Sequence, residues 1–234
     1  QRLEGALRLE ADTFLSTAFM NDGRGRFEPQ PLPTAAQIST AFGVAIADLD
    51  VDGHEDIYLV GNFSGNDSDS GPTGAGVSAW LRGLGDGAFE AVSPTTSGLL
   101  VPYEARGLAV GDLDGDLRPD VLVGVSNGPA MLFRNVGHGN RHAIGIRLSG
   151  TPANPAGVGA LVTVVRSDGR RSTREITAGG GYLSQDSATV IFGLGTSEAP
   201  VSITVRWPDG QITAMDDVAA DQLLTLGRGG PGTH

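Results

Sequence analysis

Acidic side chains recur at alternate positions in two short segments of this 234-residue chain. In the first segment, Asp48, Asp50, Asp52 and Asp56 occupy positions 1, 3, 5 and 9, and Gly53 occupies position 6. Ca²⁺ takes about six to eight oxygen ligands at roughly 2.3–2.6 Å, and flexible acidic loops can supply them. The alternate spacing lets a tight loop turn every second side chain toward one centre, while the glycine permits the bend. The segment therefore predicts a calcium site.

Position 7 of this loop belongs to His54, whose backbone carbonyl we expect to add one oxygen ligand, with Asp56 closing the shell. The second segment repeats the arrangement, with the carbonyl of Arg118 at position 7. Its position 6 is Leu117 instead of glycine, which leaves the backbone bend open, and Gly115 at position 4 offers another place for it. The predicted side-chain ligands of this second site are Asp112, Asp114, Asp116 and Asp120.

The plainer interpretation is that both segments are solvated acidic turns. Four clustered carboxylates without a counter-ion repel one another, so that one or more would have to take up a proton. The same spacing occurs twice in register, which favours metal binding over that interpretation. Mg²⁺ fits less well than Ca²⁺, because it prefers few carboxylates and several waters. We therefore predict two bound Ca²⁺ ions.

Composition excludes several other functions. The formal net charge is −11, with 27 acidic and 16 basic residues, and every basic residue is Arg. A chain this acidic, without a basic stripe, is a poor candidate for binding nucleic acid. The absence of Cys excludes disulfides, thiolate zinc sites and cysteine nucleophiles. No apolar stretch approaches the roughly 18 residues of a membrane span.

The two acidic segments belong to an internal repeat, which spans Phe42–Gly61 in the first copy and Gly107–Gly124 in the second. Short apolar runs flank each acidic segment, and such runs predict buried strands. Gly-rich hexapeptides between the strands favour hairpin turns. Several short strands per repeated unit are typical of propeller blades. Because a closed propeller needs about four to eight blades, we expect a partial β-propeller of about two and a half, with residues 1–30 supplying two strands.

The pattern changes near residue 140, after which short strands separated by Asp-Gly turns predict a small β-sandwich. The fold class is therefore all-β, and no amphipathic helix is predicted. We divide the chain into a repeat region at 1–139, a sandwich at 140–228 and a flexible tail at 229–234. A polar surface loop is expected at 64–78. The predicted sandwich strands are 142–149, 160–166, 172–178, 188–194, 201–207 and 222–226.

These residues resemble two known families. The repeat is similar to the FG-GAP/VCBS calcium-binding propeller repeats, because Phe42-Gly43 stands where that motif has its Phe-Gly. The second copy keeps the aspartates but has Arg106-Gly107 at that place. The C-terminal part resembles the ASPIC/UnbV domain of cartilage-acidic-protein-like proteins. The matching segments are 154–160, 174–175, 179–185, 192–195 and 205–210.

The resemblance implies a secreted or cell-surface protein with a calcium-dependent binding or structural role. We accordingly expect an extracellular, non-catalytic adhesion module whose partner is a protein or glycan at the cell surface. One alternative is a subunit of a homopolymeric surface fibre, in which an open blade edge accepts strands from a second copy. A second alternative is a hydrolase acting on glycans or lipids, which would need acid and base residues apart from the metal loops.

Overall fold

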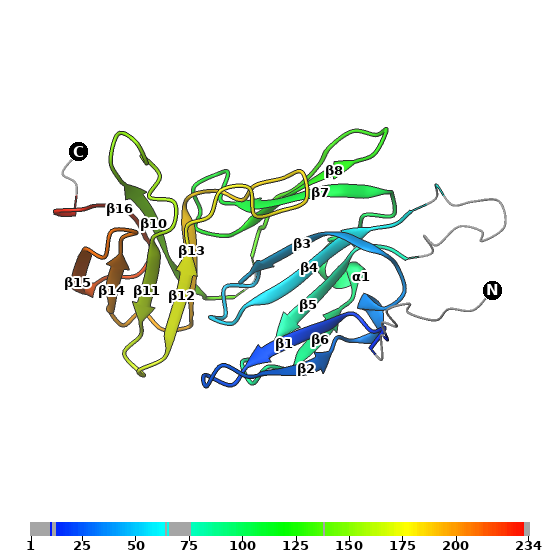
Figure 1. Ribbon diagram of the computed structural model, residues 1–234, viewed down its shortest axis with the longest axis horizontal. Helices are drawn as coiled ribbons and strands as arrows, with labels where there is room; N and C mark the ends of the chain where they lie inside the picture. The colour runs from blue at the N-terminus through cyan, green and yellow to red at the C-terminus, as the bar shows by residue number, and fades with distance from the viewer. Residues whose placement is uncertain (1–9, 11–12, 64, 66–75, 138, 232–234) are drawn as a thin grey trace, which may run out of the picture.

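The structure is a computed structural model, which describes residues 10, 13–63, 65, 76–137 and 139–231. Nearly all regular structure is β, which confirms the predicted class, and it forms five sheets (Figure 1). Helical structure in the described chain is confined to two single turns, η1 (Thr34–Ala36) and α1 (Pro94–Ser97). None of the helices in these ranges has the length and apolar character needed to cross a membrane.

The repeat region contains a hairpin and two antiparallel sheets. The hairpin occupies the place where two strands were predicted before residue 31. Its strands are β1 (Thr17–Asn21) and β2 (Phe27–Pro31). The first sheet has the order β3 (Ala41–Ala47), β4 (Asp56–Gly61), β5 (Ala79–Gly83) and β6 (Phe89–Val92). The second has the order β7 (Ala105–Gly111), β8 (Asp120–Val125) and β9 (Met131–Phe133).

The internal repeat is visible in the strand register. Ala47 pairs with Asp56 across β3 and β4, and Gly111 pairs with Asp120 across β7 and β8. Each acidic segment is therefore the loop of a β-hairpin, closed at its base by the aspartate at position 9. Residues 64 and 66–75 of the predicted polar loop lie outside the described residues.

The apolar runs beside the loops are explained by packing on both faces of the first sheet. Tyr58 and Val60 of β4 pack toward the second sheet, together with Leu108 and Val123. Ile57 and its neighbours face the opposite way, toward a cluster that includes Leu32 and Ala35 beside the β1–β2 hairpin. A strand buried on both faces has no polar alternation, so it shows in the sequence as a continuous apolar run.

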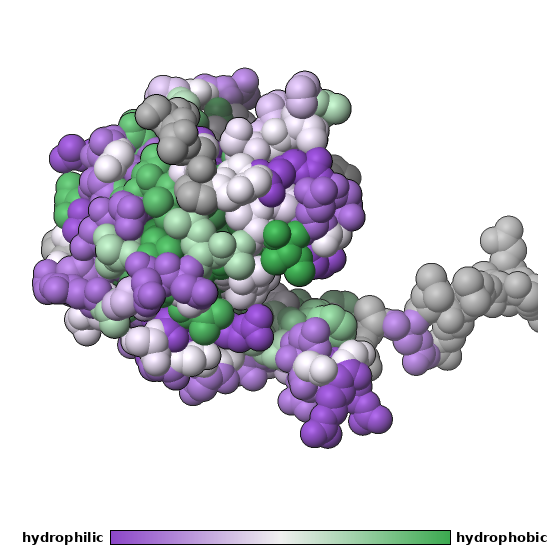
Figure 2. Space-filling model, turned by 90° about the vertical axis from the view of Figure 1, so that its left-hand side faces the viewer, coloured by the Kyte–Doolittle hydropathy of each residue, from purple (hydrophilic) through white to green (hydrophobic). Residues whose placement is uncertain are grey.

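The C-terminal part is a sandwich of two four-stranded sheets. One has the order β13 (Val190–Gly195), β10 (His142–Ser149), β16 (Gln222–Gly227) and β17 (Gly230–Pro231). The other has the order β12 (Arg171–Glu175), β11 (Leu161–Val165), β14 (Val201–Arg206) and β15 (Ile212–Val218). Their inner faces enclose one apolar core that includes Ile146, Val162, Phe192 and Trp207. Seen from this end, the surface mixes hydrophobic and hydrophilic residues (Figure 2).

Two strands of the sandwich were not predicted. β15 contains Asp216 and Asp217, which hide its character as a strand, yet it pairs with β14 and buries Thr213 and Val218. β17 pairs Gly230 and Pro231 with Gly227 and Leu226, so the first part of the segment predicted as a flexible tail is joined to the sheet. Residues 232–234 lie outside the described residues.

Candidate metal centres

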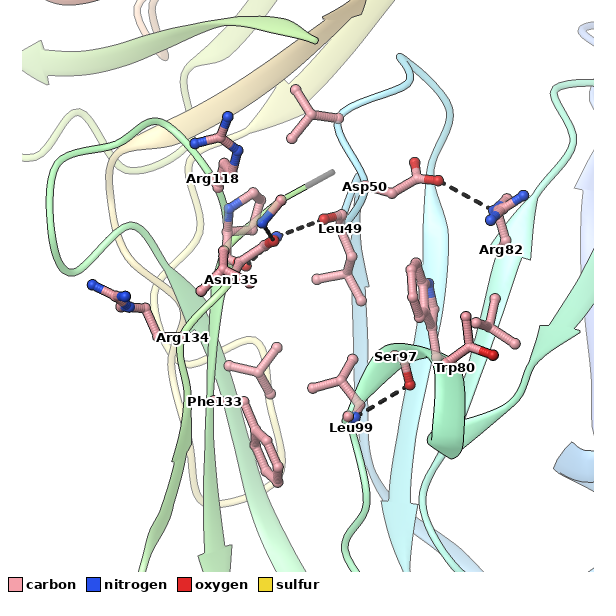
Figure 3. A pocket seen from close by; sticks show the side chains of 18 of the residues that line it. Leu49, Asp50, Trp80, Arg82, Ser97, Leu99, Arg118, Phe133, Arg134 and Asn135 are labelled. Atoms are coloured by element: carbon pink, nitrogen blue, oxygen red, sulfur yellow. Dashed lines mark hydrogen bonds and ion pairs between the residues drawn. The ribbon is translucent and has the colours of Figure 1, made fainter. Parts of the chain in front are cut away.

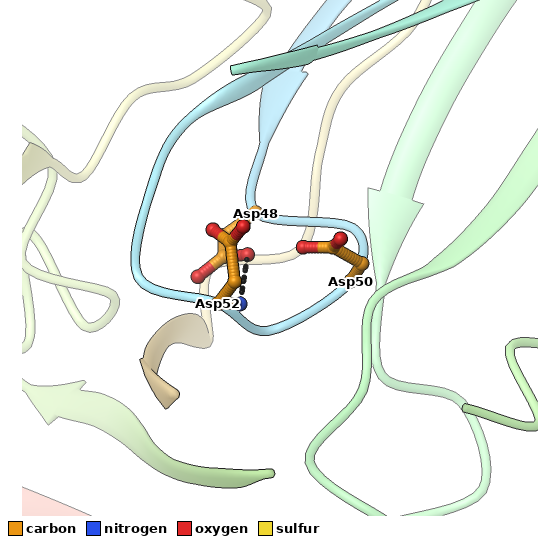
Figure 4. A group of neighbouring side chains, drawn as sticks. All are labelled: Asp48, Asp50 and Asp52. Atoms are coloured by element: carbon orange, nitrogen blue, oxygen red, sulfur yellow. Dashed lines mark hydrogen bonds between the residues drawn. The ribbon is translucent and has the colours of Figure 1, made fainter. Parts of the chain in front are cut away.

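The first acidic loop brings three of its predicted ligands together. Asp48, Asp50 and Asp52 each place one carboxylate oxygen within 4.8 Å of the others. Figure 4 shows Asp48 and Asp52 side by side on the loop, with Asp50 facing them from the other side. Three convergent carboxylates on a hairpin loop are the type of donor set that a hard divalent cation requires.

Backbone hydrogen bonds from the loop hold these side chains in place. Asp48 accepts hydrogen bonds from the backbone N–H groups of Asp52 at 2.9 Å and Gly53 at 2.7 Å. Asp52 in turn accepts one from the N–H of His54 at 2.9 Å. Asp48 is buried, and that burial raises its pKa to about 8, with further contributions from Asp56, Asp52 and Asp50. A bound cation would favour the ionised carboxylate and so act against this rise.

Two guanidinium groups hold Asp50. Arg141 Nη1 lies 2.8 Å from Asp50 Oδ1 and also donates to the Asp50 backbone carbonyl at 2.5 Å. Arg82 Nε lies 3.1 Å from Asp50 Oδ2. Both carboxylate oxygens therefore already face a positive charge.

Asp56 has a different environment from the other three aspartates. Its Oδ2 accepts hydrogen bonds from the Leu49 N–H at 3.0 Å and the Trp80 Nε1–H at 3.1 Å, and its Oδ1 accepts one from the Gly83 N–H at 2.8 Å. Burial raises its pKa to about 7, against the lowering effect of the Gly83 N–H. The structure does not place Asp56 in the group of three; its carboxylate ties the loop to β5.

The second loop repeats this division of roles. Asp112, Asp114 and Asp116 each place an oxygen within 4.8 Å of the others. Asp112 accepts hydrogen bonds from the backbone N–H groups of Asp116 at 3.2 Å and Leu117 at 3.0 Å, the same two loop positions that donate to Asp48, and a further one from Gly115 at 2.8 Å.

Asp120 corresponds to Asp56 and likewise lies outside the group of three. It accepts hydrogen bonds from the N–H groups of Leu113 at 2.9 Å and Asn135 at 2.8 Å. The carboxylate at position 9 therefore ties each loop to the strand or turn that follows the hairpin.

The backbone conformation shows how the second loop bends with Leu117 instead of glycine at position 6. Positions 4 and 6 are both left-handed in each loop: Val51 has φ 61° and Gly53 φ 91°, while Gly115 has φ 81° and Leu117 φ 63°. The two loops thus share one backbone conformation and place their single glycine at different positions. Left-handed conformations cost non-glycine residues about 1–2 kcal/mol, so each loop contains one strained residue.

The two residues predicted to contribute backbone carbonyls lie beside their clusters. His54 follows Asp52, and its imidazole Nε2 lies 3.4 Å from Arg170 Nη1. Arg118 donates its backbone N–H to Asp116 at 2.9 Å and places Nη1 3.2 Å from the same carboxylate. Their role as carbonyl ligands stays a prediction.

Both loops insert an apolar side chain into the junction with the sandwich. Val51 and Leu117, the strained residues, pack with Ala143 of β10 and Ile191 of β13 in one small cluster. The two acidic loops and the sandwich therefore share an interface.

A glycine of β13 makes the close approach possible. A Cβ added to Gly193 would lie 2.0 Å from Asp48 Oδ2 and 2.8 Å from the Val51 backbone. Gly195 donates its backbone N–H to the Val51 carbonyl at 3.2 Å. The sequence did not link Gly193, Arg82 or Arg141 to the first acidic loop, because nothing in the local sequence connects them. Gly193 lies within the segment 192–195 that carries the ASPIC/UnbV resemblance.

Comparison with protein families finds two matches in the chain. Residues 63–123 match the FG-GAP-like repeat, and residues 150–232 match the family described as ASPIC and UnbV. The chain therefore combines an FG-GAP-like repeat with an ASPIC/UnbV domain, as the sequence predicted. The second acidic loop lies inside the matched repeat, and the first precedes it. No curated protein matches the chain.

Proposed function

We propose that this protein is a calcium-binding, non-catalytic module of the extracellular or cell-surface type, in which two Ca²⁺ ions hold the repeat region against the ASPIC/UnbV domain. The observation that carries the proposal is the pair of equivalent carboxylate clusters, Asp48 with Asp50 and Asp52, and Asp112 with Asp114 and Asp116. Both lie on loops that also pack on the sandwich. Calcium would neutralise the clustered charge and fix the loops in the shape that the junction requires.

The buried Asp48 supports a cation at the first loop. Asp48 is 4% exposed as a whole residue and has three other aspartates as neighbours. Without a cation the raised pKa favours the protonated carboxyl near neutral pH, whereas a divalent ion would stabilise the ionised form and its neighbours together. Hard oxygen donors in this number favour Ca²⁺ over softer metals.

We propose an adhesive role, which the architecture supports. Two packed β modules with metal-rigidified loops form a stable platform, and we propose that the partner is a protein or glycan at the cell surface. The family resemblance supports the extracellular setting, where calcium concentrations are high enough to fill weak sites.

Calorimetric titration with CaCl₂ tests the metal assignment. We expect two binding events in the wild-type chain, with one weakened about tenfold or more in Asp52→Asn and the other in Asp114→Asn, because each substitution removes one ligand charge. Saturating calcium should raise the melting temperature by about 5–10 °C over a chelated sample. Asp86→Asn is the matched control, since Asp86 is exposed and accepts only the Ala88 N–H in a hairpin turn. No binding heat and an unchanged melt would refute the proposal.

A further inference from the structure

A cavity of about 450 Å³ lies between the β3–β6 sheet and the β7–β9 sheet, next to both metal loops. Its apolar wall includes Trp80, Leu99 and Phe133. Its polar part contains four arginines, namely Arg82, Arg118, Arg134 and Arg141. Figure 3 shows Arg118 and Arg134 on one side and Arg82 on the other, with Asp50 between them and the apolar residues below.

Each of these arginines is paired with an acid of a metal loop. Arg82 and Arg141 share Asp50 at 3.1 and 2.8 Å. On the other side, Arg134 lies 3.4 Å from Asp114, and Arg118 lies 3.2 Å from Asp116. The arginines of the cavity therefore pair with three carboxylates that also belong to the proposed metal clusters, Asp50, Asp114 and Asp116.

A divalent cation at the loops would compete with these arginines. Both oxygens of Asp50 lie within ion-pair distance of a guanidinium group, so a coordinated cation would share this carboxylate with the two arginines and weaken their hold on it. The cation also repels the guanidiniums at short range, where Coulomb energies are large in a partly buried site. When metal binds the loops, the guanidinium groups of the cavity would therefore have fewer carboxylate oxygens to pair with.

We propose that this cavity binds an organic anion with an apolar body, and that metal loading of the loops releases its arginines to hold the anionic group. Guanidinium groups pair with carboxylate, sulfate or sulfonate oxygens in bidentate geometry. The apolar wall accepts the body of the ligand, and the volume is in the range of small-molecule sites. The inference rests on the proposed calcium binding, which it extends to a second ligand whose affinity is linked to that of the metal.

The fluorescent probe 1-anilinonaphthalene-8-sulfonate, an aromatic sulfonate, provides a direct test. We expect it to bind at least about fivefold more tightly in calcium than in EGTA, which is the size of a typical coupling between two sites. The uncharged analogue N-phenyl-1-naphthylamine is the matched ligand and should show no such difference. Equal affinity of the sulfonate in both buffers, while calorimetry shows calcium bound, would overturn the inference alone.

Substitution of the arginines separates a binding role from a structural one. Arg82→Gln and Arg134→Gln should each weaken sulfonate binding about fivefold or more, while leaving calcium affinity unchanged or higher because a competitor for the carboxylate has been removed. Arg147→Gln is the control, since Arg147 is exposed on β10 and bonds to Thr189.

Variants that keep wild-type sulfonate affinity would show that the dye binds elsewhere and would refute the site. Loss of both calcium and sulfonate binding would assign the arginines to loop structure and also refute it. No calcium binding by the wild-type chain would instead overturn the proposed function, and the inference with it.

Discussion

At the scale of single residues, the aspartates of each loop have two kinds of role. Asp48, Asp50 and Asp52 converge and can bind a cation, whereas the carboxylate of Asp56 accepts hydrogen bonds from three N–H donors. The regular spacing conceals this difference, because all four are the same residue type. The carboxylate of Asp56 closes the hairpin by accepting hydrogen bonds from another strand. The other three carboxylates are available to bind a cation.

The raised pKa of Asp48 predicts a pH dependence of stability. The folded protein holds a proton on this carboxyl up to a pKa of about 8, while the ordinary value is 3.8. Between these values the unfolded chain binds fewer protons, so the free energy of unfolding of the metal-free protein should fall as pH rises from about 4 to 8. Calcium replaces the proton and should remove most of this decline.

Urea unfolding of calcium-stripped protein at pH 5, 6.5 and 8.5 measures the effect. Asp48→Asn cannot ionise and should give a flatter profile, although Asp56, with a pKa of about 7, retains part of the slope. Wild-type and Asp48→Asn profiles that run parallel would contradict the assignment.

At the scale of elements, the two loops have left-handed residues at the same two positions but place their glycine differently. Positions 4 and 6 are left-handed in both, with the glycine at position 6 in the first loop and at position 4 in the second. The non-glycine residue of each loop, Val51 or Leu117, gains packing at the sandwich junction, which offsets its backbone strain. A sequence motif that requires glycine at one fixed position therefore describes only one of the two loops.

Gly115→Ala is expected to weaken the second metal site selectively. A Cβ at Gly115 meets nothing within 4 Å, so the only cost is the left-handed backbone at φ +81°. That cost is about 1–2 kcal/mol. Where alanine moves the loop out of the left-handed conformation, calcium binding must restore that conformation, which should lower calcium affinity at this loop by up to about five- to thirtyfold and leave the first loop unchanged. Calorimetric titration would show the difference between the two sites; equal weakening of both, or of neither, would argue against the shared conformation.

At the scale of the whole molecule, the metal loops form the junction between the two parts of the chain. The Val51, Leu117, Ala143 and Ile191 cluster joins both loops to the sandwich. An ion pair between Arg174 and Glu55, with 2.6 Å between Nη2 and Oε2, adds a second link from β12. We therefore expect charge neutralisation at the loops to affect the packing of the two modules.

Gly193→Ala tests this coupling from the sandwich side. The new methyl group would collide with Asp48 Oδ2 and the Val51 backbone, so the junction must open. We expect a loss of about 1–3 kcal/mol in stability, as for other overpacked sites, together with weaker calcium binding at the first loop only. Gly229→Ala is the control, because a Cβ there meets nothing within 4 Å. Normal calcium affinity in Gly193→Ala would show that β13 does not constrain the loop.

Most of the fold could be predicted because its signals are local. Buried strands such as β4 and β10 appear as apolar runs, and the hairpin turns carry Asp-Gly or Gly-rich residues. β15 was missed because its two adjacent aspartates break the apolar pattern, and only its pairing with β14 makes it a strand. Strand propensity depends on neighbours that a single segment does not show.

The sequence alone determined the donor groups: six aspartates at alternate positions of two repeated loops converge as predicted, since a hairpin loop is positioned by its own residues. Only the tertiary structure decided what surrounds them. Asp56 and Asp120 bond to segments beyond their own hairpins. Three arginines from other segments, Arg82, Arg134 and Arg141, pair with the loop acids beside an adjoining cavity, and Gly193 leaves room for the first loop to pack on the sandwich. These contacts join residues far apart in the chain, and their specificity comes from distances and burial, which no local spacing encodes.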